Sequence, residues 1–255
     1  NLYAAGTITG QTLLFGYCIY KGCNLILQAG KSDLAAIQLS YYATHLRRQG
    51  LLQESYEQGV LAKKIADSYV SCREIANCYS VLGGWVWYLH APYSDSIELC
   101  MQGVQFGLEN GELARAAISA CNALFAKVSQ GMPLINVQQD AYSAEVFANS
   151  KSVFYPPGHI IRMFTTALRE APEHFLGALN DGVFPEDQLS KLKGSFHWSY
   201  LLHYRALLAF WGGDQARALY LARQTHENES QFPMTSFSCD HYFFLRSVIV
   251  GGKRH

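Results

Sequence analysis

This chain of 255 residues has few charged side chains and no excess of either sign. Lys and Arg together number 20, as do Asp and Glu, and charged residues make up 16% of the sequence, below the usual quarter. Because no net positive charge exists to attract phosphates, we expect no nucleic-acid partner. A low charge combined with 13% aromatic residues indicates much sheltered surface, within the chain or against neighbouring segments.

Long apolar runs are also missing. No run of about 18 apolar residues that could span a bilayer is present, and no secretory signal opens the chain. We therefore expect no membrane insertion and a cytoplasmic location. Since the chain begins at Asn1 and ends just after the apolar run SVIV, we expect residues 1–255 to be a single helical domain taken from a larger protein.

The motifs of common catalytic, cofactor and metal sites are absent. The stretch LILQAGKSD imitates a phosphate-binding loop, but Leu25 stands where that loop needs glycine, so Gly30 is better interpreted as the end of a helix. No His-Glu-x-x-His or Cys-x-x-Cys pair occurs, and no Gly-x-Ser-x-Gly. We expect no cofactor and no metal. The cysteines are odd in number and lie in apolar helical patterns, which predicts reduced, buried thiols at Cys18, Cys23, Cys72, Cys78, Cys100, Cys121 and Cys239.

Apolar residues recur at three- and four-residue spacing through most of the chain, which predicts an all-α fold. In the segment 95–111, Asp95 and Glu98 suggest a capping box and Gly111 a stop. The face expected to be buried there consists of Ile97, Cys100, Met101, Val104 and Leu108. The next helix carries small residues on two sides, Ala114 and Ala117 on one and Ala116, Ala120 and Ala123 on the other, so other helices can pack on both.

Helical hairpins recur at a regular interval. Second helices are expected to start near Leu51, Tyr93, Pro133 and Gly213, at steps close to 40 residues or twice that. This period predicts a right-handed solenoid of antiparallel helix pairs resembling tetratricopeptide repeats. Residues 171–194 contain Asn-Asp-Gly and prolines, which predicts an irregular insertion.

The stretch GGWVWYLHAPYSDSIE is interpreted as a bend between two helices. The first helix is expected to run to about Leu89, with the bend at His90 to Tyr93, because Pro92 disfavours helical geometry in the residue before it. Glycines 83 and 84 inside that helix cost about 1 kcal/mol each relative to alanine. Their presence predicts a close helix contact or a kink.

Aromatic and histidine side chains concentrate on the first helices of the expected hairpins. In a solenoid such helices tend to line one curved face, so these residues form a candidate groove for a ligand or partner. Packing within the core is the alternative interpretation for each of them. The candidate groove residues are Tyr42, His45, Tyr79, Trp85, Trp87, His90, Trp198, His203 and Tyr204.

The order of segments from about residue 34 to 249 resembles the tetratricopeptide-like helical region of large bacterial signalling proteins. The resemblance is carried by the tryptophan-bearing helix and its turn, by Glu109 to Ala114, and by Gly131 with Pro133. In that family a protein-kinase-like domain, a STAND-type ATPase, a GAF domain and a sensor histidine kinase accompany the helical region. The family's catalytic motifs lie outside this segment.

Three functions remain open at this point. The resemblance implies a non-catalytic sensing and coupling scaffold, which binds a protein or small molecule and acts on flanking domains of the same protein. A helical enzyme with a pocket near Trp85, Trp87 and His90 is the second, and it requires an acidic partner for His90 from a remote helix. A structural spacer is the third.

Overall fold

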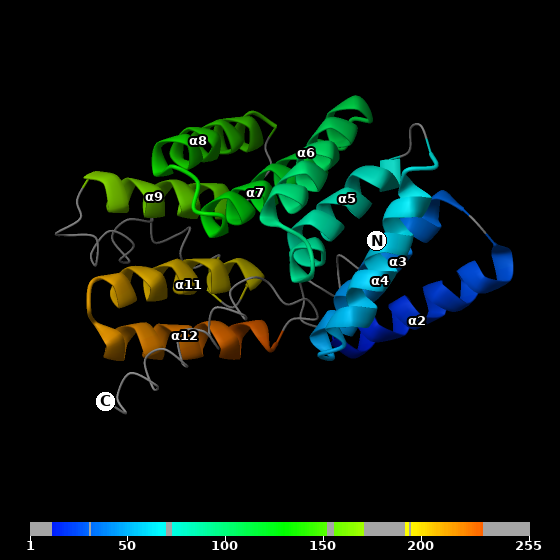
Figure 1. Ribbon diagram of the computed structural model, residues 1–255, viewed down its shortest axis with the longest axis horizontal. Coiled ribbons are helices and arrows are strands. Elements are labelled where there is room, and N and C mark those ends of the chain that lie inside the picture. Colours follow the sequence, from blue (N-terminus) through cyan, green and yellow to red (C-terminus); the bar gives the residue numbers. More distant parts are fainter. Residues whose placement is uncertain are drawn as a thin grey trace.

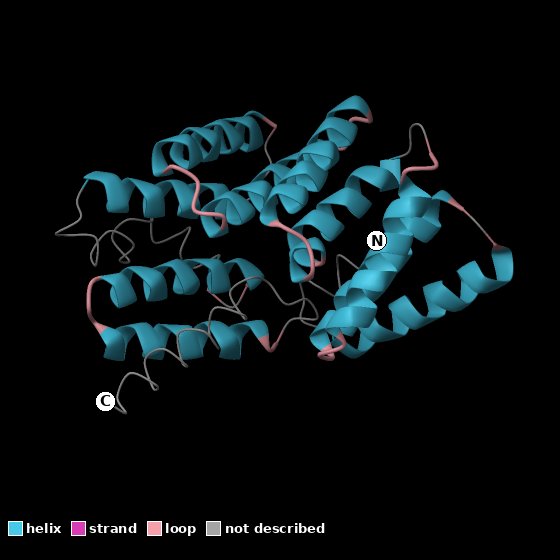
Figure 2. Ribbon diagram, in the orientation of Figure 1, coloured by secondary structure: helices cyan, strands magenta, loops and turns pink. Residues whose placement is uncertain are grey.

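The protein is described by a computed structural model, in which residues 12–30, 32–69, 73–151, 156–170, 192–193 and 195–231 are placed well enough to describe. Within these ranges the regular secondary structure is entirely helical, as Figure 2 shows. The predicted all-α fold class is therefore confirmed for this part of the chain. Nearly all of the predicted insertion at 171–194 lies outside the described residues.

Helices that are neighbours in the sequence pack in pairs (Figure 1). The structure contains α2 (Thr12–Ala29), α3 (Asp33–Arg48), α4 (Leu52–Ala66), α5 (Arg73–Trp85), a 3₁₀ turn η1 (Trp87–Leu89), α6 (Tyr93–Glu109), α7 (Leu113–Ser129), α8 (Leu134–Ser150), α9 (Pro157–Glu170), α11 (Phe196–Trp211) and α12 (Gln215–Glu229).

The helix starts keep the predicted interval. Helices α3, α5 and α7 begin at residues 33, 73 and 113, and helices α4, α6 and α8 begin at residues 52, 93 and 134. The expected starts of the second helices are thus met within two residues. Each of five helices is followed by a glycine with φ between +72° and +82°, a conformation that glycine adopts without steric cost. These are Gly30, Gly50, Gly111, Gly131 and Gly213.

Helix α5 occupies a central position in the first half of the chain. It packs against its pair partner α6 and also against the earlier helix α3 and the later helix α7. Further on, α8 packs against α9, α9 contacts α11, and α11 pairs with α12. Figure 1 shows α11 and α12 lying side by side below α8 and α9. The chain is therefore a series of helices in which each contacts the next.

Two large core clusters correspond to the two ends of this series. One combines helices α2 to α6, with Phe15, Tyr41 and Leu82 among its buried members. The other combines α7, α8, α9 and α11, with Phe164 and Tyr200 at its centre. A smaller cluster joins α11 to α12.

The buried face of α6 agrees with the prediction at Cys100 but differs from it at Met101 and Leu108. Met101 and Leu108 are 47% and 48% exposed, whereas the fully or nearly buried residues of this helix are Ser96, Leu99, Cys100, Gly103 and Gly107. The cause is close packing: a Cβ atom added at Gly107 would lie 2.9 Å from the backbone nitrogen of Ala116 in α7. The small side of α6 is buried because it allows the backbones to approach, and the apolar stripe is left half-exposed.

The two glycines of α5 confirm the predicted close helix contact. A Cβ atom at Gly83 would lie 2.8 Å from the backbone oxygen of Ser96 in α6, and one at Gly84 would lie 2.8 Å from the Cγ atom of Asn122 in α7. The Asn122 side-chain amide donates to the backbone oxygen of Ser80 over 3.2 Å. Helices α5, α6 and α7 thus meet through small residues.

The bend after α5 begins earlier than predicted. The α-helix ends at Trp85, the 3₁₀ turn follows, and α6 begins at Tyr93. Pro92 stands before the first residue of α6, and its restricted backbone suits a helix start. The predicted capping box at Asp95 is wrong, because Asp95 lies inside the first turn and accepts from the Ser94 hydroxyl instead.

The length and apolar character of a helix determine whether it can cross a membrane. Within the described ranges, none of the helices combines the length and apolar character that crossing a bilayer requires.

Candidate functional site

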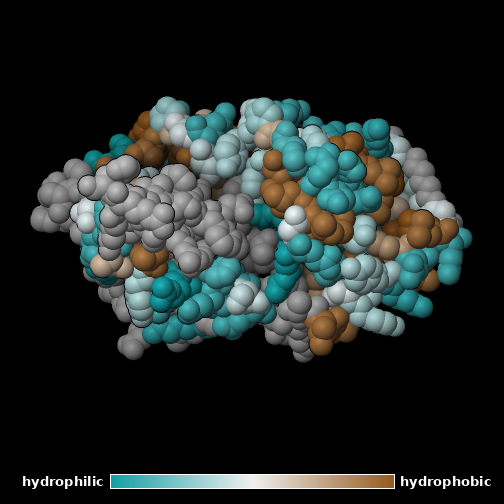
Figure 3. All heavy atoms as spheres, turned by 60° about the horizontal axis from the view of Figure 1, so that its bottom comes forward, coloured by the Kyte–Doolittle hydropathy of each residue, from teal (hydrophilic) through white to brown (hydrophobic). Residues whose placement is uncertain are grey.

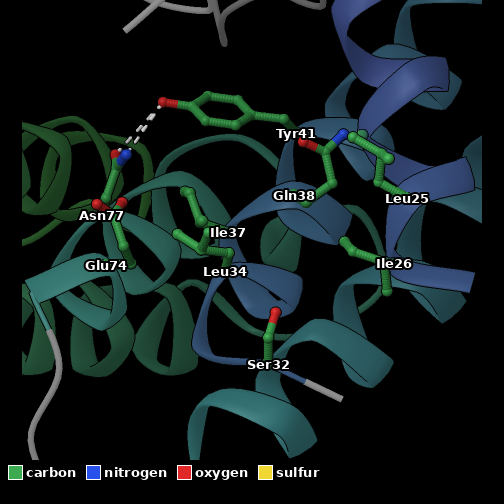
Figure 4. A pocket seen from close by; sticks show the side chains of 10 residues that line it. Leu25, Ile26, Ser32, Leu34, Ile37, Gln38, Tyr41, Glu74 and Asn77 are labelled. Carbon is green, nitrogen blue, oxygen red and sulfur yellow. Dashed lines mark hydrogen bonds between the residues drawn. The ribbon is translucent and has the colours of Figure 1, made fainter. Parts of the chain in front are cut away.

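A pocket of about 410 Å³ lies between α2, α3 and α5. This volume falls within the range of small-molecule sites. Figure 4 shows α2 contributing Leu25 and Ile26 on one side, while Glu74 and Asn77 of α5 stand on the other. The described residues that line it are Gly22, Leu25, Ile26, Ser32, Leu34, Ile37, Gln38, Tyr41, Glu74 and Asn77.

Two leucines that line the pocket are largely exposed. Leu25 of α2 is 52% exposed and Leu34 of α3 is 55% exposed, so both form the rim rather than the floor. Figure 3 shows apolar residues gathered on the right half of the molecule, where Figure 1 places α2 to α5. The rim of the pocket is therefore apolar at Leu25 and Leu34.

Three buried polar side chains lie deep in this pocket. The Asn77 amide donates to the Tyr41 hydroxyl over 3.2 Å, and both residues are at most 4% exposed. Gln38 donates to the backbone oxygen of Ile19 over 2.8 Å. These hydrogen bonds join α5 to α3 and α3 to α2, so the polar floor also connects the three walls.

Glu74 differs from the other lining residues because it carries a charge. It lies in the first turn of α5 and is half-buried. No ion pair links Glu74 to another described residue, and the other described side chains that line the pocket are neutral. The described lining therefore has one negative charge and no positive one.

Tyr42 and His45 lie where α3 meets α2. The His45 ring nitrogen Nε2 is 3.2 Å from the Tyr20 hydroxyl, and the rings of Tyr20 and Tyr42 are 6.1 Å apart. Burial, together with the nearby Arg48, lowers the pKa of His45. Neither Tyr42 nor His45 lines the pocket, although the helices that carry and contact them form its walls.

Trp87 and His90 gather around one tyrosine of α4. The ring of Tyr56 lies 5.4 Å from the Trp87 ring and 5.0 Å from the His90 ring. Trp85 packs, like Trp87, against the core cluster of α2 to α6. Among the described residues, no carboxylate pairs with His90.

Three members of the candidate groove belong to the core. Tyr79, His203 and Tyr204 are 4%, 6% and 2% exposed. Tyr204 packs against the rings of Phe125 and Phe164 at 6.2 and 4.5 Å. The prediction of an accessible groove is wrong for these three residues, because their helices turn the rings toward their neighbours.

Tyr79 and Trp198 illustrate how these rings are held. The Tyr79 hydroxyl donates to Asp67 at the end of α4 over 2.6 Å. Burial and this hydrogen bond raise the pKa of Tyr79. Trp198 is half-buried and packs against the two core clusters to which α11 contributes, the larger one with α7 to α9 and the smaller one with α12. The Arg205 guanidinium lies 5.8 Å from the centre of the Trp198 ring. The two side chains thus connect neighbouring helices.

One polar cluster was missed at the sequence level. Glu145 of α8 accepts from Arg162 over 2.6 Å and lies 2.9 Å from the His159 ring nitrogen Nδ1. Burial raises the pKa of Glu145, but the hydrogen bonds from Arg162 and His159 outweigh it, so the pKa of this carboxyl is lowered. The cluster joins α8 to α9. No sequence motif indicates this cluster, because its members come from two helices.

The described cysteines are free thiols, as predicted. Cys78, Cys100 and Cys121 are buried, and burial raises the pKa of Cys78 and of Cys121 to about 12. Cys18 and Cys23 are half-buried, less than predicted. Cys72 and Cys239 lie outside the described residues. In the ranges that the structure describes, His, Cys, Asp and Glu form no group of three or more that could hold a metal ion.

Comparison with protein-family models, with curated proteins and with solved structures found no match to this chain.

Proposed function

We propose that this chain is a non-catalytic helical-repeat scaffold that binds a small molecule and relays the event to neighbouring domains. In this proposal the helix pairs form a right-handed, tetratricopeptide-like solenoid. The neighbours are ATPase or kinase domains of a cytoplasmic bacterial signalling protein, as the sequence resemblance implies. The observation that supports it best is the double role of α5, which forms a wall of the pocket and packs on α3, α6 and α7.

A relay through α5 follows from how tightly it is packed. Gly83 and Gly84 leave no room for even a methyl group against α6 and α7. A displacement of α5 by a ligand therefore has to move those helices too, because close-packed interiors transmit strain. The polar pair of Tyr41 and Asn77 couples α5 to α3 in the same way.

The outer side of α2 supports contact with a flanking domain. Phe15 and Ile19 are buried against the core, whereas Leu13, Tyr17 and Leu27 are 91%, 66% and 82% exposed on the same helix. A helix that is apolar on both sides is usually covered on both. A domain that packs on α2 would lie next to the pocket.

The two other candidate functions have less support. An enzyme centred on His90 would need an acid or base close to it, whereas the described neighbour of this ring is Tyr56. A structural spacer has no need for a pocket with a buried polar floor. The signalling scaffold accounts for both the helix pairs and the pocket.

The relay is tested by filling the pocket with a side chain. Ile26→Trp places a large ring in the pocket, and Leu27→Trp puts the same ring on the exposed side of α2 as a control. Hydrogen exchange of both variants is measured by mass spectrometry. We expect Ile26→Trp to change protection in α5 and α7 as well as in α2 and α3. A change confined to α2 and α3, or equal changes in the control, would refute the relay.

A further inference from the structure

The pocket between α2, α3 and α5 has features that select one class of ligand. Four aliphatic side chains line it, and two of them, Ile37 and Ile26, are no more than half-exposed. A hydrocarbon body would bury its surface against them, which is the usual source of affinity in such sites. The ligand must therefore be partly apolar.

Oxygen acceptors line the α5 wall of the same pocket. Glu74 and Asn77 are three residues apart, so they project from one face of α5, and Figure 4 shows them next to each other. The Asn77 carbonyl oxygen has two lone pairs, so it can accept from a ligand even when Tyr41 is its neighbour at 3.5 Å. A carboxylate beside an amide oxygen suits a group with several N–H donors.

The charge of the lining decides the sign of the ligand. Since the described lining holds the Glu74 carboxylate and no basic side chain, an anionic head group would meet repulsion in a partly desolvated site. A primary ammonium has three donors and no acceptor, and it would offset the charge of Glu74. We infer that this pocket takes a small amphipathic amine, a protonated ammonium group on a short hydrocarbon body. The inference rests on the proposed function, in which the pocket binds a small molecule.

Glu74 could also act on the helix alone, because a carboxylate in the first turn favours helix formation. The chain supplies a control for this effect. Glu54 lies in the first turn of α4 and does not line the pocket. Replacement of either glutamate by glutamine removes the same helix interaction, but only the change at Glu74 alters the pocket.

The experiment compares three probes that share one hydrocarbon chain: hexylammonium, hexanol and hexanoate. Calorimetric titration of the whole chain and of its Glu74→Gln, Glu54→Gln and Ile26→Trp variants gives the affinities, and circular dichroism verifies that each variant is folded. We expect hexylammonium to bind best and hexanoate worst. Glu74→Gln should weaken hexylammonium about tenfold, the scale of a charged hydrogen bond reduced by partial exposure, and should leave hexanol unchanged.

Each other outcome has a distinct meaning. Equal binding of hexylammonium and hexanol, insensitive to Glu74→Gln but abolished by Ile26→Trp, would overturn the amine inference and leave a small-molecule pocket in place. Stronger binding of hexanoate would overturn it as well. If no probe binds in a manner that Ile26→Trp abolishes, the small-molecule role of the pocket fails, and the amine inference fails with it.

Discussion

Replacing Gly107 by alanine tests the close packing of α6 on α7 in the most economical way. The substitution adds one methyl group in the last turn of α6. On an isolated helix it would be favourable by at most about 1 kcal/mol, because glycine is the weaker helix former. In the folded chain the same methyl group would lie 2.9 Å from the backbone nitrogen and 3.0 Å from the Cβ atom of Ala116.

The steric cost exceeds the gain in helix propensity. The atom that the methyl group meets is backbone at the start of α7, so no side chain can rotate away, and the two helices must separate. Overpacking of this kind costs about 1 to 3 kcal/mol. We therefore expect Gly107→Ala to lower the free energy of unfolding by about 1 kcal/mol after the propensity gain is subtracted.

A second glycine in the chain provides the control. Gly16 lies inside α2, and a Cβ atom there would lie 3.7 Å from the Cε1 atom of His45, an ordinary contact. Gly16→Ala should raise the free energy of unfolding by about 0.5 to 1 kcal/mol. Urea denaturation followed by circular dichroism measures both variants. If Gly107→Ala stabilises the protein as Gly16→Ala does, α6 and α7 are not packed as closely as described.

Three further changes should shift stability in defined directions. Ala117→Leu should lower the free energy of unfolding, measured by urea denaturation, by about 1 to 3 kcal/mol, because Ala117 is fully buried. Ala114→Leu on the exposed side of α7 should be nearly neutral. Equal effects of the two changes would contradict the packing of α7 on its neighbours. Burial lowers the pKa of His197 to about 4 from 6.5. The unfolded chain therefore binds the proton first, and the free energy of unfolding should fall by up to about 3 kcal/mol as the pH drops from 6.5 to 4. A His197→Gln variant with the same pH profile of stability would refute this. Glu145→Gln should cost roughly 1 kcal/mol at pH 7. The pKa of Glu145 is lowered, so this cost should shrink only as the pH falls through that lowered pKa and the carboxylate is protonated. A pH-independent loss would contradict the ion pair with Arg162.

The turns of the fold were predictable because they depend on single residues. Gly30 and Gly111 each end a helix with positive φ, as predicted. Asp214 accepts from the backbone nitrogen of Arg217 and caps α12. Such signals are local, so they appear in the sequence without knowledge of the neighbouring helices.

The packing faces were less predictable because they depend on which helices cross and how closely. An apolar stripe with Met101 and Leu108 is the obvious buried face of α6, yet Gly103 and Gly107 are the residues in contact with α5 and α7. The distance between two helices is set by the smallest residues on both, and a single helix pattern does not contain this information.

The candidate site shows the same limit. Tyr204 and His203 were predicted to face a groove from their type and helix alone, and the core encloses them. The pocket, in contrast, combines Ile26, Gln38 and Glu74 from three helices, and none of these residues stands out in the sequence. A spacing argument within one helix does not reveal where three helices leave a space.

The account depends on helices about 40 residues apart in sequence lying side by side, and one NMR measurement tests this most directly. Asn122 of α7 reaches the backbone of α5, where its amide nitrogen bonds to the Ser80 oxygen and its Cγ atom borders Gly84. Nuclear Overhauser effects between the Asn122 side-chain amide protons and the Hα protons of Gly84 are the predicted result. Their absence, with both groups assigned in a folded sample, would contradict the packing of α5 on α7 and the relay that depends on it.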